Sequence, residues 1–269
     1  MGSHELQHNI LYICTSGQKR GEEEMVTDHV LSYIMTGYLQ VYQHGDNRRY
    51  GPGTISLLRK NTLLKTAKET AEDGTLFQSL NIFLDNTSLK KYSAQYNLMA
   101  DGPYNGTHAI DMSHDAFIKG YFESLLPYFK SGAPLTANMA NMKTFEAIEL
   151  VLRHNSRLKN MLFDYSEPFK IDLEAFMVQN YIYNIPIAQF ARLSGRSLAT
   201  FKRDFKKHFN DTPERWIKEK RLERAHFLIK EQKQPPASVF IEVGFENLSH
   251  FSTTFKKRFG YTPSMVHHQ

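Results

Sequence analysis

The sequence predicts an α+β multidomain chain with an N-terminal β domain, a helical segment and a C-terminal all-α domain. Three observations lead to this fold class. Up to about residue 110, short apolar segments are separated by turns containing Gly and Pro, which is typical of a sandwich or barrel. From residue 111 the apolar residues recur every three or four positions, as they do in helices. From residue 168 onward, short helical patterns end at Gly or Pro, and one arrangement of them occurs twice.

Residues 5–110 are expected to form the β domain. Aromatic residues recur in its strand candidates, and they either line an effector pocket or fill the core of a barrel. Filling the core is the favoured interpretation. The residues are Tyr12, Tyr33, Tyr38, Tyr42, Phe77 and Phe83. The strand candidates are "NILYICT" (9–15), "DHVLSYIMTGYLQVYQHGD" (28–46, broken at Gly37 and Gly45), "TISLLRKNTLLKTAKE" (54–69) and "TLFQSLNIFLDN" (75–86).

The helical segment, residues 111–165, contains two amphipathic helix candidates, "SHDAFIKGYFESLLPYFK" and "LTANMANMKTFEAIELVLRH". The second carries an apolar stripe at helical spacing. This stripe either pairs with its counterpart in a two-fold homodimer or packs on the β domain, and both interpretations stay open. The residues predicted for a dimer surface are Met142, Phe145, Ile148 and Leu152, with Met139 at the start of the stripe. Pro168 then interrupts the pattern, and Asp172 is placed to cap the next helix.

Charge and composition limit the possible partners of the chain. The 269 residues carry a formal charge of +5, but from residue 166 to the end there are 17 Lys plus Arg against 11 Asp plus Glu. The remaining residues carry 16 and 17, so the excess of positive charge lies in the last part, as expected of a domain that meets a polyanion. One cysteine, Cys14, excludes an internal disulfide. Without an apolar run of about 18 residues or a signal peptide, a soluble, cytoplasmic protein without a membrane partner is expected.

A repeat organises the C-terminal domain, residues 168–264. At an offset of fifty residues, "IAQFARLSGRSLATFKRDFKKHFNDTP" (187–213) aligns with "SVFIEVGFENLSHFSTTFKKRFGYTP" (238–263). Each copy has a short helix, a turn with Gly, a capping residue and a longer helix that stops at Thr-Pro, which is the helix-turn-helix plan. The units span 187–209 and 238–259. The residues that coincide are Phe201 with Phe251, Phe205 with Phe255, Phe209 with Phe259, Lys206–Lys207 with Lys256–Lys257, and Thr212–Pro213 with Thr262–Pro263.

The repeat explains why basic residues stand inside an aromatic pattern. Phenylalanines four residues apart share one helix face, which must be buried to give the unit a core. The opposite face is then free for phosphate oxygens of double-stranded DNA, whose contacts supply most of the affinity. The second helix of such a unit enters the major groove. The residues predicted to bind phosphate are Ser197, Lys206, Lys207, Lys256 and Lys257.

No enzymatic chemistry is expected in the N-terminal domain. Metal-binding β-barrels of this kind need clustered histidines, typically two separated by one residue, and the sequence has no His-x-His. His29, His44, His108 and His114 are scattered, so no metal and no cofactor are expected. The nucleotide-binding and hydrolase motifs G-x-x-x-x-G-K-[ST] and G-x-S-x-G are also missing. The domain is therefore expected to bind or dock, and the chain is predicted not to be an enzyme.

The C-terminal sequence resembles the DNA-binding domain of the AraC/XylS family of bacterial transcription regulators. The resemblance rests on "RLERAHFLI", "VGFENLSHFSTTFKKRFGYTPS" and "LSGRSLATFKRDFKKHFNDTPERWI", and it covers about residues 172–264. The upstream part resembles this family's cupin-like sensory domain and dimerisation helices loosely. The resemblance implies a transcription activator that works with RNA polymerase and reads two adjacent major-groove segments. Its effector, a small molecule or a protein, is not identified by the sequence.

The resemblance also implies which side chains meet base edges. In the first helix-turn-helix unit, residues 187–209, these are Ala199, Lys202 and Arg203, with Arg203 suited to a guanine. In the second helix-turn-helix unit, residues 238–259, they are Leu248, Ser249 and Thr253. Many members of the family carry Arg where this chain has Thr253. That departure leaves open an alternative function, a regulatory decoy that binds a protein partner and has weak DNA specificity.

Overall fold

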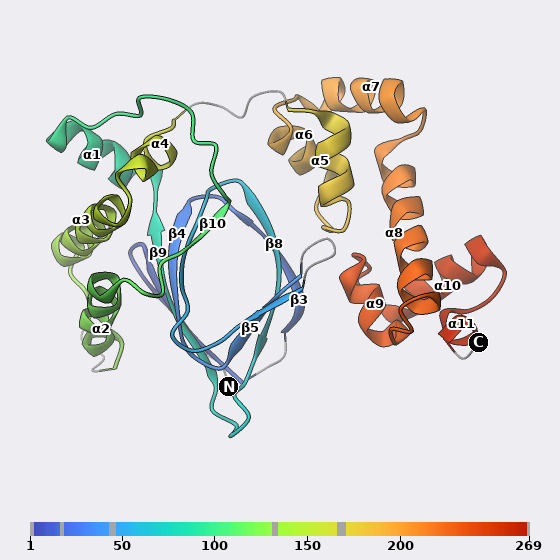
Figure 1. Ribbon diagram of the computed structural model, residues 1–269, viewed down its shortest axis with the longest axis horizontal. Helices are drawn as coiled ribbons and strands as arrows, with labels where there is room; N and C mark the ends of the chain where they lie inside the picture. Colours follow the sequence, from blue (N-terminus) through green and yellow to red (C-terminus); the bar gives the residue numbers. More distant parts are fainter. Residues whose placement is uncertain (1–2, 17–18, 43–46, 131–133, 166–170, 268–269) are drawn as a thin grey trace. The chain divides into compact units, whose positions relative to one another are not determined.

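The computed structural model describes residues 3–16, 19–42, 47–130, 134–165 and 171–267 (Figure 1). The chain divides into two compact units. The first holds most of the strands together with helices α1 to α4, and the second holds helices α5 to α11. The predicted break at Gly45 and the boundary at Pro168 lie outside the described residues.

Two antiparallel sheets that face each other form the first unit (Figure 1). The larger has the strand order β1-β2-β9-β4-β7-β10 and the smaller β3-β8-β5-β6. At the centre of the larger sheet, Leu31 lies opposite Ile82 and Tyr33 opposite Leu80. The strands are β1 (Ser3–Gln7), β2 (Ile10–Thr15), β3 (Lys19–Val26), β4 (His29–Thr36), β5 (Tyr38–Val41), β6 (Arg48–Tyr50), β7 (Ile55–Leu58), β8 (Thr62–Glu69), β9 (Phe77–Leu84) and β10 (Ala109–Asp111).

Gly37 is the point where the chain leaves one sheet for the other. It separates β4 of the larger sheet from β5 of the smaller one, and its φ is 71°. A Cβ at this position would lie 2.5 Å from the Glu69 carbonyl oxygen and 2.8 Å from Cα of Phe77. Only glycine accepts both this backbone conformation and this close approach. The break that the sequence pattern predicts at Gly37 is therefore a change of sheet.

A helix that the sequence pattern did not predict, α1 (Asn86–Tyr96), follows β9 inside the predicted β domain. Asp85 begins it, because its Oδ1 accepts hydrogen bonds from the backbone N–H groups of Thr87 at 2.8 Å and Ser88 at 2.9 Å. Leu89 and Tyr92 are the residues that this helix buries. The predicted strand, residues 75–86, extends past this cap, whereas β9 ends at Leu84, one residue before it.

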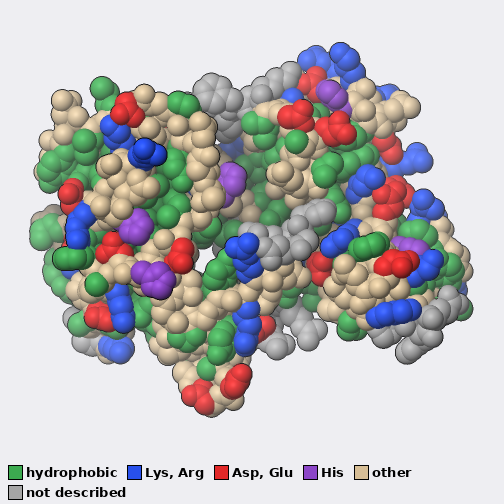
Figure 2. All heavy atoms as spheres, in the orientation of Figure 1, with side chains coloured by type: hydrophobic (Ala, Val, Ile, Leu, Met, Phe, Trp, Pro, Cys, Tyr) green, Lys and Arg blue, Asp and Glu red, His purple; other side chains and the backbone are tan. Residues whose placement is uncertain are grey.

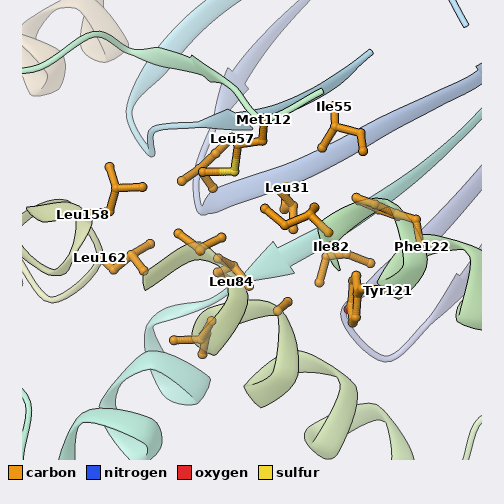
Figure 3. Packing of buried hydrophobic residues seen from close by; sticks show 14 of the residues in the cluster. Leu31, Ile55, Leu57, Ile82, Leu84, Met112, Tyr121, Phe122, Leu158 and Leu162 are labelled. Atoms are coloured by element: carbon orange, nitrogen blue, oxygen red, sulfur yellow. The ribbon is translucent and has the colours of Figure 1, made fainter. Parts of the chain in front are cut away.

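Helices from the predicted helical segment share one core with the larger sheet (Figure 3). They are α2 (Ala116–Lys130), α3 (Ala137–His154), the 3-10 helix η1 (Ser156–Leu158) and α4 (Lys159–Leu162). Ile118, Phe122 and Leu125 of α2 are fully buried in the same cluster as strand residues Leu31 and Ile82. Residues 111–165 thus belong to the first unit.

The predicted dimer surface on α3 is split by this packing. Ile148 is 0% exposed inside the unit's own core, so it is not available on a surface, which corrects its placement there. Phe145 and Leu152 are half-buried against the same core, and the Phe145 ring meets the Tyr92 ring edge-on at 5.2 Å. Met142 remains 67% exposed. The stripe therefore packs on the sheet through one edge and leaves Met142 at the surface.

From residue 171 onward the second unit is helical (Figure 1). Asp172 begins it as predicted, accepting a hydrogen bond from the Ala175 N–H at 2.6 Å. The Thr-Pro pairs begin the next helices as well as following the preceding ones, since α8 and α11 start at Pro213 and Pro263. The helices are α5 (Leu173–Asn180), α6 (Ile187–Leu193), α7 (Leu198–Phe209), α8 (Pro213–Lys230), α9 (Pro236–Glu242), α10 (Leu248–Phe259) and α11 (Pro263–His267). Within the described residues, no helix has the length and apolarity to cross a membrane.

Candidate nucleic-acid interface

Helices α7 and α10 are the second helices of the two predicted helix-turn-helix units, and they begin in the same way. Ser197 Oγ accepts a hydrogen bond from the Thr200 N–H at 3.3 Å, and Asn247 Oδ1 accepts one from the His250 N–H at 2.7 Å. Each cap satisfies a backbone donor that has no partner within the helix. Both helices begin one residue after the cap and have 12 residues, so residues fifty positions apart occupy the same place in each helix.

The two helices also end alike, at residues with positive φ. Asn210 has φ 53° and Gly260 has φ 87°, and their N–H groups donate to the carbonyls of Lys206 and Lys256. This left-handed conformation stops a helix, and Asn and Gly are the residues that adopt it most readily. Local sequence therefore determines both ends of each helix.

A phenylalanine face buries each helix against α8. Phe201, Phe205, Phe251 and Phe255 are all 0% exposed. At the far end of α7 the Phe209 ring lies 4.7 Å from the Trp216 ring of α8, and at the far end of α10 the Phe259 ring lies 4.7 Å from the His226 ring of α8. Each fully buried side chain of this size stabilises the fold by roughly 1.5–3 kcal/mol. One central helix thus supports both second helices.

The face of α7 opposite these rings carries the predicted contact residues. At about 100° per residue, Ala199, Arg203 and Lys207 form a row directly away from Phe201 and Phe205. All three are exposed. Figure 2 shows Lys and Arg side chains gathered at the outer edge of the molecule over α7. Lys202 and Lys206 are also exposed and flank this row on one side.

Helix α10 repeats the arrangement with different side chains. Its row opposite the rings is Ser249, Thr253 and Lys257, with Lys256 beside it, and all four are exposed. The row of α7 offers a guanidinium group in the middle, whereas the row of α10 offers a hydroxyl there. The two faces have the same geometry and different hydrogen-bonding capacity.

Two arginines of the basic runs are held by the protein itself. Arg258 Nε donates to Glu219 Oε2 of α8 at 2.6 Å. Arg196 Nε donates to Asp204 Oδ2 at 3.1 Å, and its Nη1 donates to the carbonyls of Ile171 and Ser194. By contrast, Arg203 Nε lies 3.9 Å from Asp204 Oδ1 with 76% of its side chain exposed, and an exposed pair of this kind is weak. Arg203 can therefore turn to a ligand, while Arg196 and Arg258 anchor their helices.

Leu198 belongs with the predicted contact residues and was not among them. It is the first residue of α7 and is 42% exposed, and Leu248, the first residue of α10, is 41% exposed. The fifty-residue offset that aligns the phenylalanines also aligns these two leucines. That offset was the signal in the sequence that identifies Leu198.

The described residues show no grouping suited to a metal ion. Three or more His, Cys, Asp or Glu side chains do not come together anywhere among them. His29 is 0% exposed, and its Nδ1 accepts a hydrogen bond from the Lys60 N–H at 3.2 Å. Burial, followed by the charges of Lys60 and Arg59, lowers the pKa of His29 to about 3. This histidine is a neutral core residue at physiological pH.

Two family models match the chain. A model described as "Helix-turn-helix domain" matches residues 190–269, which include α7, α8 and α10. A model described as "ExsA N-terminal regulatory domain" matches residues 29–161, which run from β4 into α4. The first model falls within the second unit, and most of the residues that the second model matches belong to the first unit.

Among similar proteins is the "Virulence regulon transcriptional activator VirF" of Yersinia enterocolitica, 37% identical over 94 residues, or 35% of each chain. The "HTH-type transcriptional regulator ExsA" of Pseudomonas aeruginosa is 34% identical over 92 residues, 34% of this chain and 33% of that one. The matched part spans about a third of these relatives' length. A crystal structure of an apo ToxT variant from Vibrio cholerae strain SCE256 aligns over 98% of both chains, at 13% identity and a TM-score of 0.44.

Proposed function

The chain belongs to the AraC/XylS family of helix-turn-helix regulators, and from this premise we propose that it is a sequence-specific DNA-binding activator of transcription. One observation carries the proposal. Two helices with caps at equivalent positions, the same buried rings and exposed faces of the same geometry are mounted on one helix, α8. Activation is supported by relatives such as VirF, whose name describes an activator.

The length of α8 suits two adjacent contacts with DNA. Its 18 residues span roughly 27 Å at about 1.5 Å per residue. Successive major-groove segments on one face of DNA lie about 34 Å apart. Helices α7 and α10, mounted on this rod, are proposed to enter two such segments, with RNA polymerase as a further partner at the promoter.

Side chains on the exposed rows have the chemistry for base edges. Arg203 has two donors that match the two major-groove acceptors of guanine, and Lys202 offers a further donor. Ala199, Leu198 and Leu248 present apolar groups suited to the methyl group of thymine. Ser249 and Thr253 make single hydrogen bonds that many bases can satisfy. The proposal therefore gives α7 more of the sequence discrimination than α10.

The test is to select binding sites for the full chain from random double-stranded DNA at one fixed salt concentration. We expect a site with two segments about one helical turn apart, of which one is better defined. Transcription in vitro by a bacterial RNA polymerase from a template with that site should then increase when the protein is added. Flat base preference in both segments would instead support the decoy function, which Thr253 favours.

The exposed lysines at the ends of α7 and α10 are expected to supply affinity without specificity. Replacing Lys207 or Lys257 by Ala should weaken binding equally on the selected site and on random DNA, because phosphates are the same in both. The slope of log affinity against log salt should decrease by about 1 for each variant. Lys91→Ala, on the exposed side of α1 in the other unit, is the control. A loss confined to the selected site would contradict the phosphate assignment.

A homodimer formed through α3 is also proposed, and Met142 is the residue that tests it. Met142→Glu should yield monomers with an unchanged unfolding temperature, because the side chain is already 67% exposed. Light scattering after size-exclusion chromatography measures the mass. Met99→Glu, at a methionine that is 73% exposed in the same unit, should leave the dimer intact. A Met142→Glu variant that still runs as a dimer, or a parent chain that is monomeric, would rule out this surface.

A further inference from the structure

Arg221 of α8 joins the two helix-turn-helix halves of the second unit. Its Nε and Nη2 donate to the carbonyl oxygens of Tyr181 and Tyr183, both at 2.8 Å. Its Nη1 donates to the Gly244 carbonyl at 2.8 Å and to Asn184 Oδ1 at 3.3 Å. Residues 181–184 connect α5 with α6 in the first half, and Gly244 lies in the turn between α9 and α10 in the second half.

The geometry of this contact is that of a rigid clamp. A guanidinium group is planar, and its N–H donors point in fixed directions, so acceptors from several segments fix its position. Hydrogen bonds from a charged donor are also stronger than neutral ones. A lysine at the same place has one flexible ammonium group and is unable to reproduce this fork.

Gly244 shows how closely the two halves approach each other at this junction. Its φ is 97°, and a Cβ there would lie 2.3 Å from the Ile182 carbonyl oxygen and 2.9 Å from Cζ of Arg221. A second bridge runs beside the first, since Asn184 Nδ2 donates to Glu246 Oε1 at 2.6 Å. The turn of the second half is therefore tied both to α8 and to the α5–α6 connection of the first half.

We propose that Arg221 is a positioning residue that fixes the separation and rotation of α7 relative to α10, and hence the spacing of the DNA segments that the chain accepts. The inference rests on the proposed DNA-binding function. Each of the two helices packs on α8 through its own phenylalanines, so these contacts link the two halves only through α8. The Arg221 clamp adds a direct link between the α5–α6 connection and the turn before α10.

A fixed frame has a measurable consequence for binding. One additional base pair between the two segments moves them apart by about 3.4 Å and rotates one against the other by roughly 35°. A rigid protein is unable to engage both segments after that change. A protein whose halves move independently engages both, but binds the natural spacing less tightly because it must order them on the DNA.

The experiment uses the full chain, the selected site and the same site with one base pair inserted. The parent is expected to bind the inserted site about ten-fold or more weakly than the natural site. Arg221→Lys should bind the natural site about ten-fold more weakly than the parent, and the penalty for the insertion should fall below about three-fold. Arg224→Lys is the matched control one turn away, because the Arg224 ion pair is with Glu242 of α9 in the second half. This variant should keep the parent's spacing penalty.

The possible outcomes distinguish failure of the Arg221 role from failure of the proposed DNA-binding function. A parent chain that selects no sequence rejects both. A parent that selects a two-segment site, with an Arg221→Lys variant that keeps the full spacing penalty, overturns the role of Arg221 alone. Circular dichroism checks that the variant is folded. If it is not, Asn184→Ala decides, because it removes the exposed Asn184–Glu246 bridge and the Asn184 contact with Arg221. A reduced spacing penalty supports the clamp, and an unchanged one overturns it.

Discussion

Phe255→Ala is expected to lower the free energy of unfolding of the helical unit by about 3–5 kcal/mol. The side chain is 0% exposed and lies among aromatic rings, with ring centroids 5.6 Å from Phe251 and 4.7 Å from Phe259. Truncation removes buried apolar surface and leaves a cavity that the surrounding helices fill only in part. We expect DNA binding to be lost together with stability, because α10 depends on this ring for its position on α8.

Urea unfolding of the full chain measures this effect. Trp216 is the only tryptophan of the chain, and it lies in the helical unit with its ring 5.7 Å from Phe205 and 4.7 Å from Phe209. Its fluorescence emission therefore reports unfolding of the second unit without a tryptophan signal from the first unit. Phe227→Ala is the matched control, because this ring on α8 is 44% exposed and its truncation should cost less than about 1 kcal/mol. Equal losses in the two variants would show that Phe255 is not a principal support of the fold.

Base discrimination is expected to differ between α7 and α10. Arg203→Ala should flatten base preference in one segment of the selected site, because a bidentate contact to guanine contributes about 1–3 kcal/mol of discrimination. Thr253→Ala should leave the other segment nearly unchanged, since one hydroxyl contributes little selectivity. Thr253→Arg should sharpen that segment toward guanine. Thr253 and Arg203 occupy equivalent positions on helices of the same length that are capped at equivalent positions, so position is held constant while the side-chain chemistry changes.

Sites are selected for the parent and the three variants side by side at one salt concentration. All of the substituted side chains are exposed, so unfolding temperatures should stay close to that of the parent. If Thr253→Ala relaxes the site more than Arg203→Ala does, the second helix is the principal reader and the proposed division is reversed.

Features set by neighbours in the sequence were predictable from it. The caps Asp172, Ser197 and Asn247 act on N–H groups three residues ahead, so spacing alone identifies them. The repeat showed which faces of α7 and α10 are buried, because phenylalanines spaced four residues apart lie on the same face of a helix. The exposed faces followed from the buried ones, whereas the candidates for base contacts came from the resemblance to the AraC/XylS family.

Features that depend on distant partners were not predictable. A stripe on α3 indicates an apolar face but not its partner, and only the packed sheet shows that Ile148 lies in the core. In the sequence Arg258 is indistinguishable from the neighbouring basic residues, and its hydrogen bond to Glu219 is visible only in the structure. Arg221 carries even less signal, because three of its acceptors are backbone carbonyls, which every residue has.

The separation of buried and exposed rows on α7 and α10 has a consequence for how such a protein can evolve. Folding is maintained by the caps and the phenylalanines, whereas Ala199, Arg203, Ser249 and Thr253 lie on the opposite face and contribute little to it. Mutations at these four positions are therefore shielded from selection on stability. Under the proposed function, substitutions at these positions can change base preference while the caps and the buried phenylalanines stay the same.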